Sequence, residues 1–105
     1  MGFNMQKLMK QAQKMQADVA RVQDGLKEKL VEGQAGGGVV KVTANGAQEI
    51  VSISIDPEVI DPEDKEMLED LVLAATREAL TAAREVAAAE MGKVTGGMGL
   101  PGGMF

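Results

Sequence analysis

Basic side chains recur at a fixed spacing near the start of the chain. Lys7, Lys14 and Arg21 lie seven residues apart. Lys10 follows Lys7 by about one helical turn, so on an α-helix the four cations line one stripe. No acidic residue interrupts them between positions 1 and 17. Such a stripe indicates a surface for an anionic partner, and the competing interpretation is an ordinary solvated helix face.

The charge of the whole chain points the other way. Its 105 residues carry a net charge of −5, which by itself disfavours nucleic acid as a partner. Residues 1–31, however, contain six Lys and Arg against three Asp and Glu, whereas residues 32–105 contain five against thirteen. We therefore expect the N-terminal segment to contact an anionic partner while the acidic remainder repels it.

Residue types that the chain lacks restrict its chemistry. Without His or Cys there is no imidazole base, thiol nucleophile or Cys/His zinc site. Catalysis by carboxylates alone needs two acids held in a cleft, and no segment is suited to building one. The absence of Trp and Tyr argues against stacking of unpaired bases. We expect no enzymatic activity, no cofactor, no metal site and no small-molecule substrate.

Composition also bears on location in the cell. A chain without Cys fits the reducing cytoplasm. No apolar run approaches the roughly 18 to 20 residues of a membrane span, and the N-terminus lacks the apolar core of a signal peptide. We expect a cytoplasmic protein without a membrane partner.

A long N-terminal helix must carry the basic stripe. Apolar residues recur at spacings of three and four from position 5 to 26, and Asn4 is a suitable N-cap. This heptad seam is typical of a helix that packs against another long helix, in the same subunit or in a second one. Its members are Met5, Leu8, Ala12, Met15, Val19, Val22 and Leu26.

Three short strands follow this helix. The segments VVKVTA and QEIVSISI alternate in polarity, and Asn45-Gly46 between them is a strong hairpin signal because both residues tolerate positive φ. The first half of KLVEGQAGGG adds a strand, and its glycines form a turn. We predict a three-stranded antiparallel meander with one solvated face and one apolar face that needs a cover.

A second long helix follows the strands. Asp61-Pro62 supplies an N-cap and first-turn proline, and an Ala-rich helical period extends from Met67 to about Glu90. Residues 56–70 hold eight carboxylates and one lysine without calcium-loop spacing, so we interpret them as helix-start acids rather than a metal site. The predicted fold class is α+β, in the order helix, three strands, helix.

The chain divides into one domain and a tail. Residues 1–91 hold all the periodic segments, whereas residues 92–105 contain six Gly and one Pro, which predicts a flexible Gly/Met-rich end. The string GMGLPG at 97–102 matches a dinucleotide-site pattern, but no strand precedes it and no helix follows it. We expect no nucleotide there.

Four blocks of the sequence resemble the YbaB/EbfC family of bacterial nucleoid-associated proteins. They are LMKQAQKMQ (8–16), GGGVVKVTANG (36–46), SIDPEVID (54–61) and DKEMLEDLVLAA (64–75). The resemblance implies an α+β homodimer in which the sheets form a central body and the long helices project like the arms of tweezers. It also implies double-stranded DNA binding in the nucleoid, with little or loose sequence preference and no catalytic residue.

Carried over by position, the resemblance places DNA contacts on both long helices. The candidates on the second helix are the weaker ones, because a Glu follows each of them. The resemblance further implies that DNA binding by this protein affects nucleoid organisation and gene expression. The six candidates are Lys7, Lys10, Lys14, Arg21, Arg77 and Arg84.

A protein partner is the alternative to DNA. The heptad seam and the methionines Met5, Met9, Met15 and Met67 would then form an adaptable groove for a partner helix, as in an adaptor or chaperone-like dimer for which DNA is incidental. The simpler interpretation of these methionines is that they fill a core that lacks aromatic residues. A third alternative is a structural dimer whose charge asymmetry serves solubility.

Overall fold

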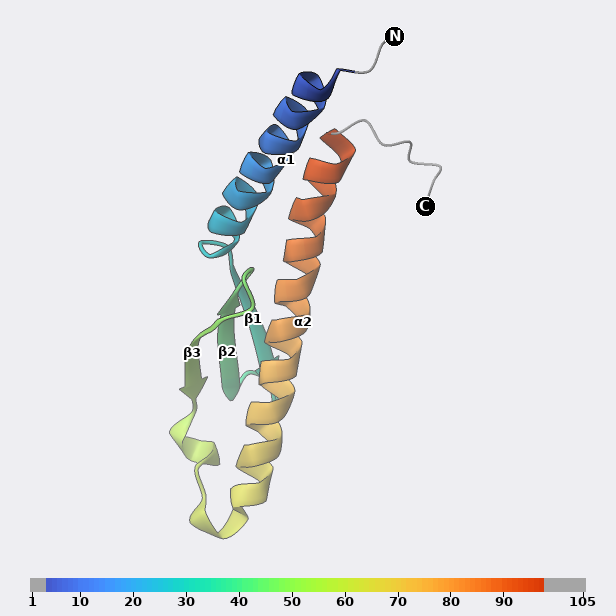
Figure 1. Ribbon diagram of the computed structural model, residues 1–105. Helices are drawn as coiled ribbons and strands as arrows, with labels where there is room; N and C mark the ends of the chain where they lie inside the picture. Colours follow the sequence, from blue (N-terminus) through green and yellow to red (C-terminus); the bar gives the residue numbers. More distant parts are fainter. Residues whose placement is uncertain (1–3, 98–105) are drawn as a thin grey trace.

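The computed structural model describes residues 4–97 and confirms the expected order of elements (Figure 1). The chain measures 76 × 27 × 16 Å, and its radius of gyration of 20.2 Å compares with about 13 Å for a compact domain of this length. It is an elongated molecule in which two long helices extend beyond a small sheet. The elements are α1 (Met5–Leu26), β1 (Leu30–Ala35), β2 (Val40–Asn45), β3 (Ile50–Ile55), the 3₁₀ helices η1 (Pro57–Val59) and η2 (Pro62–Asp64), and α2 (Lys65–Gly97).

The strands form an antiparallel meander in the order β1-β2-β3, as predicted. Val42 of β2 pairs with Gly33 of β1 and Ile53 of β3, and these three residues share the apolar face. Two rows of polar residues cross the opposite face, which confirms the alternation expected for a half-solvated sheet. One row is Glu32, Thr43 and Ser52, and the other is Gln34, Lys41 and Ser54.

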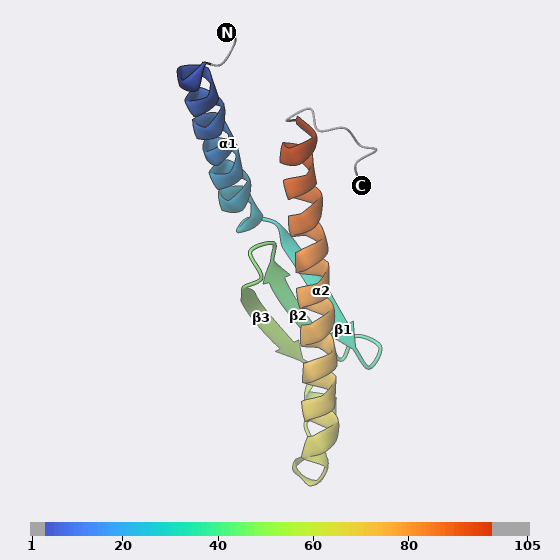
Figure 2. The ribbon, with the colours of Figure 1, turned by 45° about the vertical axis from the view of Figure 1, so that its right-hand side comes forward.

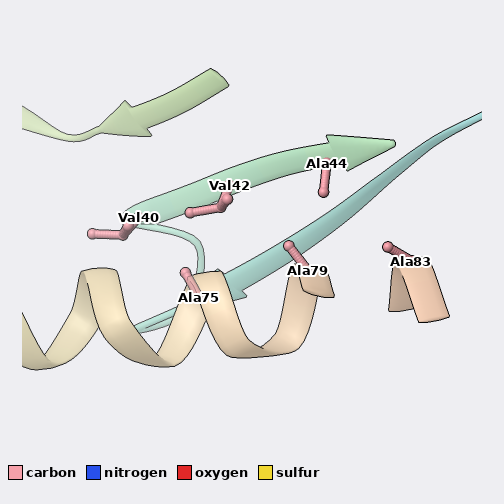
Figure 3. Close-up of a cluster of buried hydrophobic side chains, with 6 residues drawn as sticks. All are labelled: Val40, Val42, Ala44, Ala75, Ala79 and Ala83. Atoms are coloured by element: carbon pink, nitrogen blue, oxygen red, sulfur yellow. The ribbon is translucent and has the colours of Figure 1, made fainter. Parts of the chain in front are cut away.

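The core lies between the apolar face of the sheet and α2 (Figure 3). Gly33 lies directly under the helix, where a Cβ would overlap the carbonyl oxygen of Ala75 and the amide nitrogen of Ala79. The backbones of β1 and α2 therefore touch, which requires small residues on both. The core residues, each 0% exposed, are Val40, Val42, Ala44, Ala75, Ala79 and Ala83.

The turn between β2 and β3 lies where Asn45-Gly46 predicts it, but its geometry differs. The expected positive-φ turn at these two residues is wrong: Asn45 still belongs to the strand, and Gln48 has the positive φ of 64°. Asn45 acts through its side chain, whose Oδ1 accepts hydrogen bonds from the amides of Ala47 (3.0 Å) and Glu49 (3.1 Å). Gly46 is needed because a Cβ there would lie 2.7 Å from the last side chain of α1.

α2 begins as expected and ends later than expected. Asp61 caps η2, because its Oδ1 accepts a hydrogen bond from the amide of Glu63 at 2.9 Å, and η2 leads directly into the helix. The sequence pattern ends the helix near Glu90, whereas it continues for another seven residues. An ion pair between Lys93 and Glu90 supports these last turns. Residues 98–105 of the predicted tail, with most of the GMGLPG string, lie outside the described residues.

Candidate nucleic-acid interface

α1 carries the predicted basic stripe and is fixed at its C-terminal end. Asn4 caps its start, because its Oδ1 accepts a hydrogen bond from the amide of Lys7 at 3.2 Å. At the other end Leu26 is only 4% exposed. The amide of Gly46 in the β2–β3 loop donates to the carbonyl oxygens of Leu26 and Lys29, each at 2.9 Å. These contacts attach the C-terminal end of α1 to the β2–β3 loop.

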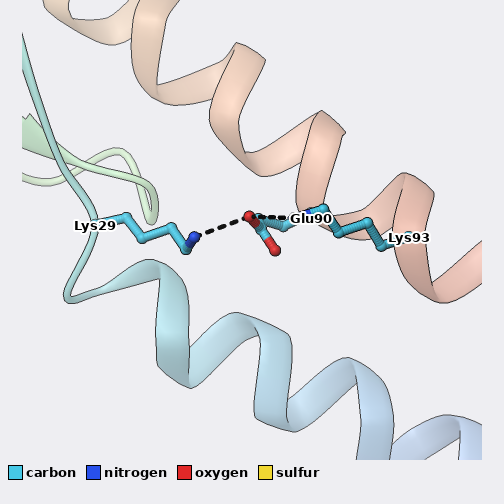
Figure 4. Close-up of polar contacts among 3 residues, drawn as sticks. All are labelled: Lys29, Glu90 and Lys93. Atoms are coloured by element: carbon cyan, nitrogen blue, oxygen red, sulfur yellow. Dashed lines mark hydrogen bonds and ion pairs between the residues drawn. The ribbon is translucent and has the colours of Figure 1, made fainter.

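An ion-pair cluster joins the segment after α1 to the end of α2 (Figure 4). Nζ of Lys29 lies 2.9 Å from Oε1 of Glu90, and Nζ of Lys93 lies 3.2 Å from the same oxygen. The hydrogen bond from Lys29, followed by that from Lys93, holds the pKa of the Glu90 carboxyl below its ordinary value. Lys29 and Glu90 are 61 residues apart, so the cluster connects distant segments of the chain.

An open cleft of about 590 Å³ lies between α1 and the last turns of α2. Lys14 and Arg21 of α1 line it together with Lys93 of α2. Two acids, Asp18 and Glu90, also line it, and both are paired with cations: Nη2 of Arg21 lies 2.8 Å from Oδ1 of Asp18. Figures 1 and 2 show the two helices side by side beyond the sheet. The cleft therefore brings together cations from both helices.

The six candidate residues are all exposed, but they occupy different places. Lys14 and Arg21 line the cleft, and the other two α1 candidates lie nearer the start of that helix. Arg77 and Arg84 lie on α2 outside the lining of the cleft. The role of all six in binding DNA stays a prediction.

The sequence pattern does not single out Lys29, Glu90 or Lys93. Lys93 lies in the Gly-rich stretch that predicts a flexible tail, and Lys29 follows the periodic part of the first helix. The spacing of three residues between Glu90 and Lys93 could have indicated their ion pair, because residues three apart are neighbours on a helix. The contact between Lys29 and Glu90 has no local signal, because it depends on how α1 and α2 are placed in space.

The heptad seam of α1 is covered at its base and open toward its start. Leu26 is buried and Val22 half-buried, whereas Met5 is 61% exposed. A shallow apolar groove of about 410 Å³ runs past Met15 and Val19 on α1. Within the part of the chain that the structure describes, the expected helix–helix packing is therefore confined to the base of α1.

The interpretation of four methionines as core residues is wrong for the single chain. The core is built from Val and Ala, and the close contact between sheet and helix leaves no room there for long side chains. The four methionines are exposed instead, three on α1 and one near the start of α2. They are Met5, Met9, Met15 and Met67.

A second uncovered apolar surface lies at β3, which is an edge strand of the sheet. Ile50 and Val51 are exposed, and Ile53 is 50% exposed. Beside them, Ile55 and Leu73 line an apolar groove of about 480 Å³ between β3 and α2. An apolar edge strand offers unpaired backbone groups to another chain unless something covers it.

Residues 4–97 contain neither a cluster that could bind a metal ion nor a helix that could cross a membrane. In this part of the chain, acidic side chains do not gather in groups of three or more that could hold a metal ion. None of the helices in it combines the length and the apolar character needed to cross a membrane.

Comparisons with known proteins point to one family. Residues 1–98 match the model of the YbaB/EbfC DNA-binding family. A nucleoid-associated protein of Moorella thermoacetica is 63% identical over 99 residues, which cover 94% of this chain and 95% of that one. A nucleoid-associated protein of Pelotomaculum thermopropionicum is 57% identical over 102 residues, or 97% of each chain.

The fold is shared with a solved structure. The crystal structure of the uncharacterized protein HP0035 from Helicobacter pylori matches with a TM-score of 0.71 at 25% identity, over 79% of this chain and 87% of that one. The family match over nearly the whole length confirms the resemblance that the four sequence blocks indicate. The chain belongs to the YbaB/EbfC DNA-binding family.

Proposed function

We propose that this protein binds double-stranded DNA in the cytoplasm, within the nucleoid, as a homodimer with little or loose sequence preference. Family membership and relatives named nucleoid-associated proteins support this assignment. The observation that carries it is the separation of charge: a positive α1 stands apart from an acidic body, and two of its cations, Lys14 and Arg21, line a cleft with Lys93. Through this binding, the protein organises the nucleoid and affects gene expression.

The acidic body orients the protein on DNA. The acidic run at residues 56–70 lies at the opposite end of the molecule from the cleft (Figure 1). Phosphates are repelled there and attracted at the helical arms, so only one end of the protein approaches the duplex. The exposed arm residues are suited to phosphates rather than to base edges, and DNA shape and deformability then decide where the protein binds.

Useful affinity requires two copies of the chain. One α1 offers four candidate cations, which neutralise too few phosphates for tight binding. A dimer doubles that number and, at about −0.9 per phosphate, predicts a log-log salt slope near −7 if all engage. If only some of these cations reach a phosphate, the slope is smaller, and we expect roughly −3 to −6.

The sheet is the proposed hub of the dimer. The second copy covers the apolar edge at β3 and the groove beside it, because a two-fold partner presents the same uncovered strand and the same groove. The small sheet alone has little apolar surface to bury, so association also supplies burial that a chain of this length lacks. Such a hub holds two pairs of helical arms apart at a fixed separation.

Charge reversal on α1 tests this assignment. In the variant K7E/K10E/K14E, we expect duplex affinity to fall at least about tenfold and the salt slope to become shallower, because phosphate contacts are lost. Fluorescence anisotropy with a labelled random-sequence duplex measures both quantities. Unchanged affinity and slope would show that the stripe on α1 is not the DNA-binding surface.

A matched variant controls for net charge. K27E/K41E/K65E changes the net charge by the same amount at three exposed lysines that lie off the stripe. We expect a smaller loss of affinity, since only the long-range attraction is reduced. Equal losses of duplex affinity in the two variants would mean that net charge alone, and not the stripe on α1, determines binding.

Binding of a protein partner is the second candidate function. The open end of the heptad seam supports it, because Met5, Leu8 and Met9 form an exposed apolar strip on α1. In an adaptor or chaperone-like dimer, a partner helix would cover this strip. Failure of the protein to bind duplex even at about 50 mM salt would favour this function over DNA binding.

A further inference from the structure

Glu90 lines the cleft that the proposed function assigns to DNA, and it pairs with Lys93, which also lines the cleft, and with Lys29 in the segment after α1. Its Oε1 accepts hydrogen bonds from Nζ of Lys29 at 2.9 Å and from Nζ of Lys93 at 3.2 Å (Figure 4). The Glu90 side chain is 19% exposed, whereas those of Lys29 and Lys93 are 49% and 73% exposed. The Glu90 side chain is thus half-buried, and the side chains of both lysines are exposed.

We propose that Glu90 is a built-in counterion of a phosphodiester-binding cleft, and that a DNA phosphate replaces it as the acceptor for Lys29 and Lys93. This inference rests on the proposed function and adds two lysines to the DNA-contacting residues. Lys14 and Arg21 line the same cleft, so a DNA backbone that enters it meets cations from both helices. Exposed ion pairs are weak and screened by salt, which permits the exchange.

The other acid of the cleft is placed in the same way. Asp18 is 23% exposed and pairs at 2.8 Å with Arg21, which is 74% exposed. Both acids therefore neutralise cleft cations in the free protein. A single phosphate oxygen can accept from two ammonium groups, as Oε1 of Glu90 does here, and a phosphodiester offers further oxygens to the remaining donors.

A purely structural role for Glu90 predicts the opposite result. The pair with Lys29 also connects α1 to α2 across a long stretch of sequence. As a brace, Glu90 would hold the arms in position for DNA, and its removal would weaken binding. As a counterion, it competes with DNA, and its removal strengthens binding. The sign of the change in affinity separates the two roles.

The variant E90Q tests the inference against the control E63Q. Both substitutions remove one negative charge, but Glu63 is exposed in η2 at the far end of the molecule (Figure 1). In duplex titrations at several salt concentrations, we expect E90Q to bind about three- to tenfold tighter than wild type, with a slope more negative by about 1 to 2. The duplex affinity of E63Q should remain within about twofold of that of wild type. Weaker binding by E90Q, or equal behaviour of the two variants, would overturn the inference.

The lysines provide an internal check. In the background K29A/K93A, the partners of Glu90 are absent. The substitution E90Q should then raise duplex affinity no more than E63Q does, because it frees no lysine to bind a phosphate. The same gain as in the wild-type background would contradict the proposed exchange. Circular dichroism of each variant at the assay temperature confirms that the chain stays folded.

Failure of the inference can be distinguished from failure of the proposed function. If wild type binds duplex and E90Q matches E63Q, the function stands and the counterion role is wrong. If wild type does not bind duplex, the function is wrong, and elution from phosphocellulose still tests the cleft. Elution of E90Q at higher salt than wild type and E63Q would support the anion-binding cleft, whereas co-elution would overturn it.

Discussion

α2 is held in two different ways along its length. Beside the sheet, three fully buried alanines pack against β2, and the backbone of Gly33 touches the helix. Beyond the sheet, α2 is held near α1 by the ion pair between Lys29 and Glu90 and by half-buried residues such as Val94, around an open cleft. The first region is close-packed and fully buried, and the second is charged and open.

This difference separates stability from binding. Close packing leaves no space for a ligand and makes the body sensitive to a single added methyl group. Exposed ion pairs contribute little to stability, so the charges of the arms can change without unfolding the chain. Substitutions in the body should therefore alter the free energy of unfolding, and substitutions in the arms should alter DNA binding.

Among single substitutions, Gly33→Ala should change the protein most, through its stability. The added methyl group would overlap backbone atoms of α2, which cannot move away as a flexible side chain could. We expect the free energy of unfolding, measured by urea titration, to fall by about 2 to 4 kcal/mol. Gly92→Ala is the control, because its methyl group would enter open space on α2. We expect it to raise the free energy of unfolding by about 0.5 to 1 kcal/mol. A neutral Gly33→Ala would disprove the close contact between β1 and α2.

The next effect concerns the proposed hub. Ile53→Lys places a charge on the uncovered apolar face of β3, whereas Ser52→Lys places one on the polar face of the same strand. In sedimentation equilibrium at micromolar concentration, we expect Ile53→Lys to be monomeric and Ser52→Lys to remain dimeric. The monomer should lose about half of the salt slope for DNA, because half of the cations are absent. A dimeric Ile53→Lys would place the hub elsewhere.

Single substitutions on α1 and α2 should change duplex affinity by smaller and unequal amounts. Lys14→Gln removes a cation that lines the cleft, and Arg77→Gln removes an exposed cation outside it. We expect Lys14→Gln to weaken duplex binding about threefold and to reduce the magnitude of the salt slope by about 1 to 2 in the dimer. Arg77→Gln should change both quantities less. The reverse order would mean that DNA contacts α2 away from the cleft.

The smallest effect is the titration of Glu90. Its two lysine partners lower its pKa, so the midpoint in a ¹³C NMR titration should lie below the ordinary glutamate value of about 4.3. The ion pairs therefore stabilise the folded state above that ordinary value, and their contribution is lost as the pH falls through the lower folded-state value. In K29M/K93M the midpoint should return toward the ordinary value. Equal midpoints in the two proteins would show that the lysines do not hold this carboxylate.

The order of elements and the pairing of strands were predictable from the sequence because they depend on local patterns. Alternation in VVKVTA and QEIVSISI defines which side chains share a face, and Asp61-Pro62 marks a helix start. The turn at Asn45-Gly46 was predictable in place but not in geometry. Gly46 lies against Leu26, a contact between segments that no local pattern reveals.

The candidate site was predictable only on one side. The heptad spacing of Lys14 and Arg21 identifies the stripe on α1, but the opposite wall of the cleft comes from α2. Glu90 lies at the end of the predicted helix, but Lys93 reaches that wall only because α2 continues through Gly92, a residue type that disfavours helix. The placement of α1 relative to α2 depends on contacts at Gly46 and at the sheet, and sequence periodicity does not encode it.

The proposed function requires that the helical arms bind the phosphates of duplex DNA. Its most direct test is a titration of fluorescent random-sequence duplex with the wild-type protein at several salt concentrations, beside a single-stranded DNA of the same length. We expect a preference for the duplex and a log-log salt slope of about −3 or steeper. A flat salt response, or a preference for the single strand, would show that the arms do not bind duplex phosphates.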